Sequence, residues 1–168
     1  ADLYAQTTAG PRLSAGRKGG DAWAEDVRVT AQGSAFTLCL ADGARIPCAT
    51  RLLGAHNIGN ILLSCSVARH LGLSDQQLKR GVEQLRPVEH RLQLLQSAGG
   101  VTVIDDAFNS NPHGAKAALD VLAAFPGRRI IVTPGMVELG AREKEFNRAF
   151  GRDMAACADV CVLIGVKH

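Results

Sequence analysis

Hydrophobic and polar residues alternate over positions 26–40, the spacing of a strand with one buried face. A turn-forming run at 31–34 divides this stretch, so the pattern predicts an antiparallel hairpin with one buried face. Residues 1–25 precede it, are rich in glycine and show no period. They are expected to form an irregular lead-in.

A second turn signal, Asp42-Gly43, leads into a third strand predicted over residues 45–50. Pro47 lies within this strand and has no N–H to donate to a sheet ladder. The third strand is therefore expected at the edge of its sheet.

The spacing becomes helical after residue 54. Ser74, followed by Gln77 three residues later, is typical of a capping box and predicts a helix that runs to about Leu85. Arg86-Pro87 then breaks the pattern, and we expect a boundary between domains 1–86 and 87–168 there. Before Ser74, apolar side chains at steps of three and four predict a long helix over 55–71, with Ile58, Ile61, Leu62, Cys65, Ala68 and Leu71 on its buried face.

Strand-like and helical stretches alternate in the second half, which predicts right-handed crossovers and a parallel sheet in an α/β fold. Two apolar runs, 92–97 and 101–105, flank the turn-forming Gly99-Gly100. The second run is expected to be a buried parallel strand. The elements predicted after it are a helix from Pro112 to about 124, a strand over 129–133, a helix over 141–156 and a strand over 159–164.

Composition narrows the class of protein. Hydrophobic residues make up 46% of the chain and aromatic residues 4%, so an aliphatic core of normal size is expected. The net charge of +3 is too small to indicate a nucleic-acid partner. No stretch reaches the roughly 18 apolar residues of a membrane span, and no leader peptide is evident. Because the chain begins at Ala1, it is expected to be a piece of a longer protein.

The five cysteines are odd in number and form no Cys-x-x-Cys pair. We interpret them as small buried apolar residues in a reducing cytoplasm, in preference to disulfides or zinc ligands.

The run from Asp105 to Pro112 gathers polar side chains where a predicted strand leads into a helix, and open α/β sheets bind nucleotides at such points. Asp106 is placed to accept hydrogen bonds from ribose hydroxyls. The alternative is a helix-capping carboxylate. Asn109 and Asn111 favour a binding site, because a cap needs only one side chain.

His90-Arg91 follows the hinge at Pro87. The planar donors of Arg91 suit phosphate oxygens. An exposed charge on a linker is an equally open interpretation. His90 either hydrogen-bonds a neighbour or is solvated.

The segment Gly54–Asn60 opens the long helix. Asn57 and Asn60 are three residues apart and so share a face, where their amides suit a base edge or an anion. Helix capping by Asn57 is equally open. The phosphate-loop pattern Gly-x-x-x-x-Gly-Lys-Ser/Thr and the dinucleotide pattern Gly-x-Gly-x-x-Gly do not occur in the sequence.

The run Thr133–Gly140 also follows a predicted strand, and it is expected at the same sheet edge as Asp106, either lining the same cleft or as an ordinary loop. Glu138 is a candidate partner for a substrate amine or a nearby arginine. The charged residues that follow are expected to form a solvated helix face with i,i+4 pairs: Glu143, Lys144, Glu145 and Arg148.

Four motifs, in this order and spacing, resemble the Mur ligase family. They are Gly54-x-His56-Asn57-x-x-Asn60, His90-Arg91-Leu92, Asp105-Asp106-Ala107-Phe108-Asn109-Ser110-Asn111-Pro112 and Gly135-Met136-Val137-Glu138-Leu139-Gly140. The resemblance covers residues 25–168, and the last two motifs are most similar to the D-alanyl-D-alanine-adding members.

The resemblance implies a three-domain cytoplasmic enzyme of peptidoglycan synthesis that uses ATP and Mg²⁺. Such an enzyme phosphorylates the carboxylate of a UDP-muramoyl peptide and lets an amine, here D-Ala-D-Ala, attack the acyl phosphate. Residues 1–86 would be the end of the central ATPase domain, a hairpin with helices. Residues 87–168 would be part of a Rossmann-like C-terminal domain.

Carried over by motif, Asn60 would contact adenine, with His56 and Asn57 beside it. Arg91 would reach the ATP phosphate or ribose, and Asp106 would hold the ribose. Substrate contacts in the cleft would come from Asn109, Ser110 and Asn111. No residue of the chain is expected to be catalytic or to bind metal.

The sequence departs from the family at Phe108, where tyrosine is usual, and at Asn147, where histidine is frequent. The phosphate loop, the magnesium ligands, the uridine-nucleotide domain and about half of the C-terminal domain are missing. The chain alone is therefore expected to be inactive. Two alternatives stay open: a non-catalytic nucleotide-binding or interaction module, and a related amide ligase acting on lipid-linked precursors or folates.

Overall fold

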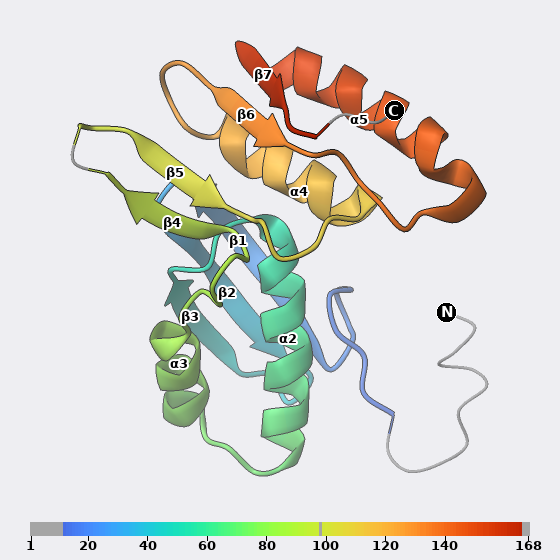
Figure 1. The fold of residues 1–168 in the computed structure, drawn as a ribbon. Helices are drawn as coiled ribbons and strands as arrows, with labels where there is room; N and C mark the ends of the chain where they lie inside the picture. The colour runs from blue at the N-terminus through green and yellow to red at the C-terminus, as the bar shows by residue number, and fades with distance from the viewer. Residues whose placement is uncertain (1–11, 98, 166–168) are drawn as a thin grey trace. The chain divides into compact units, whose positions relative to one another are not determined.

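The computed structural model describes residues 12–97 and 99–165, and it divides the chain into two compact units (Figure 1). The first is built from residues up to 29, 33–51 and 55–85. The second contains 30–32, 52–54 and the chain from residue 86 onward. Part of the predicted lead-in, residues 1–11, lies outside the described residues. The assignment of the two halves to a central and a C-terminal domain stays a prediction.

The first unit contains a three-stranded sheet in the order β1 (Ala22–Thr30), β2 (Gly33–Leu40) and β3 (Arg45–Thr50). β3 pairs antiparallel with β2 and lies at an edge, as the proline within it predicted. The predicted inner face of β2 is confirmed, because Phe36, Leu38 and Leu40 are buried. The first strand begins four residues before the predicted start, so the lead-in is shorter than expected.

Two helices pack against this sheet, α2 (Ala55–His70) on β2 and α3 (Asp75–Gln84) on β3. Ser74 caps α3 as predicted. Its side chain accepts from the backbone N–H of Gln77, whose side chain bonds back to Ser74. The predicted buried face of α2 holds at Ile58, Ile61, Leu62 and Cys65. Leu71 is 73% exposed, contrary to prediction, because it lies beyond the last turn of α2.

The second unit begins with a hairpin of β4 (Gln93–Gln96) and β5 (Thr102–Asp105), which pair antiparallel around the predicted glycine turn. The expectation that β5 is a buried parallel strand is wrong. In the described part of the chain its only ladder is with β4, and Val101 and Val103 are 60% and 43% exposed. A continuous apolar run shows that both faces of a strand are apolar, and it does not show which neighbours are present.

Helix α4 (Pro112–Ala123) follows, and then β6 (Ile130–Thr133), the short 3₁₀ turn η1 (Gly140–Arg142), α5 (Glu143–Cys157) and β7 (Val160–Leu163). β6 and β7 pair in parallel, as the alternation of strands and helices predicted, and α4 packs against α5. Leu53, Leu92 and Val121 form the centre of a hydrophobic cluster in this unit.

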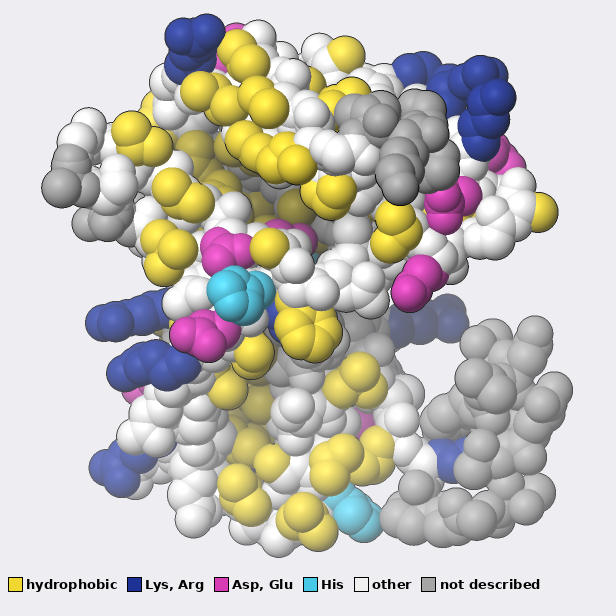
Figure 2. Space-filling model, viewed as in Figure 1, with side chains coloured by type: hydrophobic (Ala, Val, Ile, Leu, Met, Phe, Trp, Pro, Cys, Tyr) yellow, Lys and Arg dark blue, Asp and Glu magenta, His cyan; other side chains and the backbone are white. Residues whose placement is uncertain are grey.

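Hydrophobic side chains remain visible over the strands of the second unit (Figure 2). Among the hydrophobic residues of β6 and β7, Ile130, Val132, Val162 and Leu163 are each between 43% and 59% exposed. No helix in the described residues is long and apolar enough to cross a membrane.

All five cysteines are free. Cys39, Cys48 and Cys65 are buried in the first unit, as expected of small apolar residues, and burial raises the pKa of Cys48 to about 11. Cys161 is exposed, so the expectation of burial is wrong there.

Candidate functional site

The loop after β5 carries Asp106, the predicted ribose ligand. One of its carboxylate oxygens, Oδ1, accepts a hydrogen bond from the Leu92 N–H at 3.1 Å. The alternative interpretation, a carboxylate that caps α4, is not what the structure shows, because Asn111 is the N-cap of that helix. Asp106 instead ties the loop to the chain that precedes β4.

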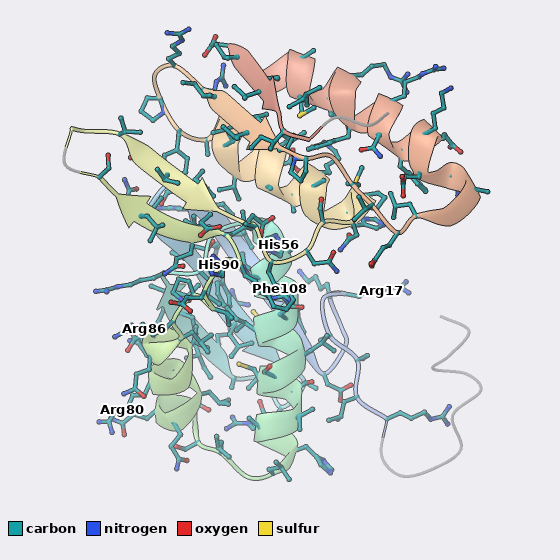
Figure 3. All side chains as sticks on the ribbon, viewed as in Figure 1. Arg17, His56, Arg80, Arg86, His90 and Phe108 are labelled. Atoms are coloured by element: carbon teal, nitrogen blue, oxygen red, sulfur yellow. The ribbon has the colours of Figure 1, made fainter. Side chains whose placement is uncertain are left out.

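His90 lies beside the same loop (Figure 3). Its Nδ1 is 2.8 Å from Oδ2 of Asp105, and its carbonyl oxygen accepts from the Phe108 N–H at 3.1 Å. Of the two sequence interpretations, a hydrogen-bonded neighbour and a solvated ring, the first is therefore correct. The sequence did not identify Asp105 as the hydrogen-bond partner of His90, because the two residues are 15 positions apart in the chain.

The electrostatics of this pair favour its charged form. The hydrogen bond and the charge of Asp105 raise the pKa of His90. The hydrogen bond from His90, together with the Ala107 N–H, lowers the pKa of Asp105. Both directions describe an imidazolium that donates to a carboxylate.

Arg91 stacks its guanidinium on the Phe108 ring, with Cζ 4.1 Å from the ring centroid. The N–H donors of a guanidinium lie in its plane, so stacking on one face leaves them accessible. No ion pair or hydrogen bond of the Arg91 side chain occurs within residues 12–97 and 99–165. The group can therefore bind an anion such as a phosphate without first breaking a protein contact.

The three predicted substrate residues lie between this loop and α4. Asn111 accepts the Gly114 N–H on Oδ1 at 2.9 Å, so its carbonyl oxygen is used by the helix cap. Asn109 is exposed and Ser110 is half-buried. These two keep their polar groups available, and Asn111 keeps its amide N–H groups.

The remaining predicted residues belong to the first unit, at the start of α2 (Figure 3). Asn60 donates through Nδ2 to Oδ1 of Asn57 at 3.4 Å, so the two amides share a face as the three-residue spacing predicted. His56 and Asn60 are exposed and Asn57 is half-buried. Their role in binding adenine stays a prediction.

A second loop, Thr133–Gly140, follows β6 and has a fixed backbone. Both polar atoms of the Asn147 side chain bond to the backbone of Met136. Glu138 is exposed at a φ of +63° and has no ion pair with a described arginine. The sequence noted Asn147 only as a departure from the family, and its contact with the loop was missed.

The charged face predicted on α5 differs in detail. Arg142 pairs with Glu145 at 2.9 Å, which is an i,i+3 pair, and Glu143 accepts the Leu139 N–H. The i,i+4 pairs expected among these residues do not form in the part that the structure describes.

A hollow of about 170 Å³ in the first unit lies at the other end of α2 from His56, beside Arg69 and His70. Arg69 there donates to Asp42 and Asp75, both at 2.6 Å, so its charge is already paired. The hollow is not part of the predicted site.

Mg²⁺ prefers several oxygen ligands. The described residues contain no group of three His, Cys, Asp or Glu side chains that would hold a metal ion.

Comparison with known proteins points to one family. The model described as "Mur ligase, glutamate ligase domain" matches residues 90–168. The UDP-N-acetylmuramoyl-tripeptide–D-alanyl-D-alanine ligases of Escherichia coli and Haemophilus influenzae are each 34% identical to the chain, over 133 and 134 residues. These matches cover 79% and 80% of the chain but 29% of each relative, so the chain spans less than a third of their length.

Solved structures agree. MurF from Acinetobacter baumannii superposes with a TM-score of 0.84 at 30% identity, covering 92% of this chain and 34% of that one. MurF from Thermotoga maritima in complex with ADP gives 0.80 at 25% identity, covering 92% and 36%.

Proposed function

We propose that the chain is part of an ATP-dependent ligase of the Mur ligase family, because residues 90–168 match the family model described as "Mur ligase, glutamate ligase domain". This ligase joins D-alanyl-D-alanine to a UDP-muramoyl tripeptide. In the reaction, a substrate carboxylate oxygen attacks the γ-phosphorus of ATP and ADP leaves. The amine then attacks the acyl carbon, loses a proton, and phosphate leaves.

The observation that carries this proposal is the joining of two motifs by the Leu92–Asp106 hydrogen bond of 3.1 Å. That bond and the Arg91–Phe108 stack hold two kinds of ligand group on neighbouring backbone segments. The Arg91 guanidinium is suited to phosphate, and the Asp106 carboxylate is suited to ribose hydroxyls. The curated relatives named above, and a neighbour solved with ADP, support the same nucleotide.

We assign roles to this chain's own residues on that basis. Arg91 binds ATP phosphate or ribose, and Asp106 accepts hydrogen bonds from the ribose. His56, Asn57 and Asn60 contact the adenine. Asn109, Ser110 and Asn111 line the place where the amine substrate binds, with Asn111 acting through its amide N–H groups. Mg²⁺ bound by other residues of the complete enzyme would supply charge stabilisation.

The test uses the complete ligase and follows ADP release with UDP-muramoyl tripeptide, D-Ala-D-Ala, ATP and Mg²⁺. Asp106→Ala and Arg91→Ala should each raise the KM for ATP about tenfold or more, because each removes a hydrogen bond to a charged or polar ligand group. Asp153→Ala and Arg152→Ala on the exposed surface of α5 are the matched controls. A wild-type enzyme that releases no ADP with these substrates contradicts the function, and normal kinetics of Asp106→Ala contradict the site.

A further inference from the structure

Two strained residues flank Arg91. His90 has a φ of +59° and Leu92 a φ of +47°, in the left-handed region that glycine favours. This conformation is uncommon for residues other than glycine; histidine adopts it more often than most, and for Leu92 it is unfavourable. Strain of this kind persists only where the surroundings fix the backbone, and it concentrates at ligand clamps.

The loop after β5 supplies the contacts that fix this backbone. The Phe108 N–H donates to the His90 carbonyl oxygen at 3.1 Å, and Asp106 accepts the Leu92 N–H at 3.1 Å. The Leu92 side chain is buried in the hydrophobic cluster of the second unit. The segment 90–92 is therefore held on both sides of Arg91.

The side-chain contact is the pair between His90 and Asp105, with Nδ1 and Oδ2 2.8 Å apart. It joins the residue before Arg91 to the residue before Asp106. The two proposed nucleotide ligands are thus each one residue away from a member of the pair. Loss of the pair would release the strained segment and, with it, the placement of Arg91 over Phe108.

We propose that His90 and Asp105 are positioning residues for the nucleotide site, which hold Arg91 and Asp106 in the arrangement that binds ATP. This inference rests on the proposed function, since it concerns the same site. Neither residue need touch the nucleotide. Their contribution is to reduce the conformational freedom that Arg91 would otherwise lose on binding.

The pair also makes nucleotide affinity depend on pH. The charged groups that act on His90 are Asp105 from β5 and Glu89 from its own segment. The Asp105 hydrogen bond raises the pKa of His90, so the imidazolium persists above the usual range for histidine. As the pH rises through that pKa, the charge-assisted bond becomes a weaker neutral one and ADP binding should weaken.

The experiment measures the Kd for ADP and the KM and kcat for ATP in the complete ligase. His90→Ala and Asp105→Asn should raise the Kd for ADP and the KM for ATP about tenfold, the loss expected for a hydrogen bond between charged groups. The kcat at saturating ATP should change less than about twofold. His113→Ala, an exposed histidine at the start of α4, is the matched control.

The pH profile separates positioning from general stability. In the wild type the Kd for ADP should rise with pH across the titration of His90, and in His90→Ala this dependence should disappear. Profiles that are the same in both proteins would overturn the proposal, as would unchanged Kd values in both variants. If a variant does not fold, the pH dependence of the Kd for ADP in the wild type is compared with an NMR titration of His90. A Kd that does not change with pH as His90 titrates overturns the proposal. A wild-type ligase that binds no ADP would instead contradict the proposed function.

Discussion

Asn147 binds both backbone polar groups of Met136. Its Oδ1 accepts from the Met136 N–H at 2.8 Å, and its Nδ2 donates to the Met136 carbonyl oxygen at 2.7 Å. The same Nδ2 donates to the Glu143 carbonyl oxygen at 3.1 Å. One side chain on α5 thereby makes the two backbone hydrogen bonds that a neighbouring strand would make in a sheet. Met136, in the loop that follows β6, is only 3% exposed.

We predict that Asn147→Ala lowers the free energy of unfolding by roughly 2 kcal/mol. The substitution leaves the buried backbone N–H and carbonyl oxygen of Met136 without their hydrogen-bond partners. Urea denaturation followed by circular dichroism measures this loss. Lys144→Ala on the exposed face of the same helix is the control and should change stability by less than about 0.5 kcal/mol. Equal stability of the two variants would show that the Asn147 contacts contribute nothing.

Histidine, which is frequent at this position in the family that the sequence resembles, gives a graded form of the same experiment. The two nitrogens of an imidazole lie on different edges of the ring, so both cannot bond to one residue as the amide of Asn147 does. Asn147→His should therefore keep one of the two Met136 contacts and fall between wild type and Asn147→Ala in stability.

A second prediction concerns Gly33, the first residue of β2. Its φ is +137°, and a Cβ there would collide with the Thr50 carbonyl oxygen on the neighbouring strand. Gly33→Ala should destabilise the chain by roughly 3 kcal/mol or more, since the backbone of a paired strand must move. Gly43→Ala separates the two causes, because Gly43 also has a positive φ, +90°, but open space around it. It should cost only about 1 kcal/mol.

Local signals predicted most of the elements. The capping box at Ser74 and the proline in β3 depend on residues within a few positions, and both predictions are confirmed. Partners distant in sequence were beyond such signals. The polar cluster after β5 was evident, but the bond from Leu92 to Asp106 spans 14 residues and the His90–Asp105 pair spans 15. No pattern in the sequence states which backbone N–H a carboxylate will accept.

The misplacement of β5 has a similar origin. Its apolar run resembles that of a parallel strand covered on both faces. The glycines before it bring β4 alongside in the opposite direction, and the side chains of Val101 and Val103 stay exposed. The hydrophobic pattern of a strand shows which faces it can bury. Which strand it pairs with, and whether other elements pack on its faces, depends on the rest of the fold.

The third prediction concerns acid stability and rests on Glu25 in β1. Its carboxylate accepts from the Trp23 indole at 3.1 Å and from Arg45 at 2.8 Å, and Lys18 lies 3.3 Å away. These contacts lower the pKa of Glu25 from its ordinary value of 4.5 to about 2. Above the ordinary value, folded and unfolded chains are both ionised at this residue and the stabilisation is fully present. As the pH falls from there toward the folded-state pKa, only the unfolded chain takes up the proton, so the stabilisation is lost.

Glu25→Gln should therefore lose less stability than the wild type when the pH is lowered from about 6 to about 3. The measurement is the urea midpoint of both proteins at the two pH values, at low salt because dissolved ions screen the charge of this half-buried carboxylate. Glu83→Gln on α3, whose carboxylate is 3.9 Å from Lys79, serves as the control for the loss of one negative charge. If Glu25→Gln and Glu83→Gln show the same fall in midpoint as the wild type, the contacts of Glu25 do not contribute to acid sensitivity. A smaller fall in Glu25→Gln alone assigns that part of the sensitivity to the cluster formed with Trp23 and Arg45.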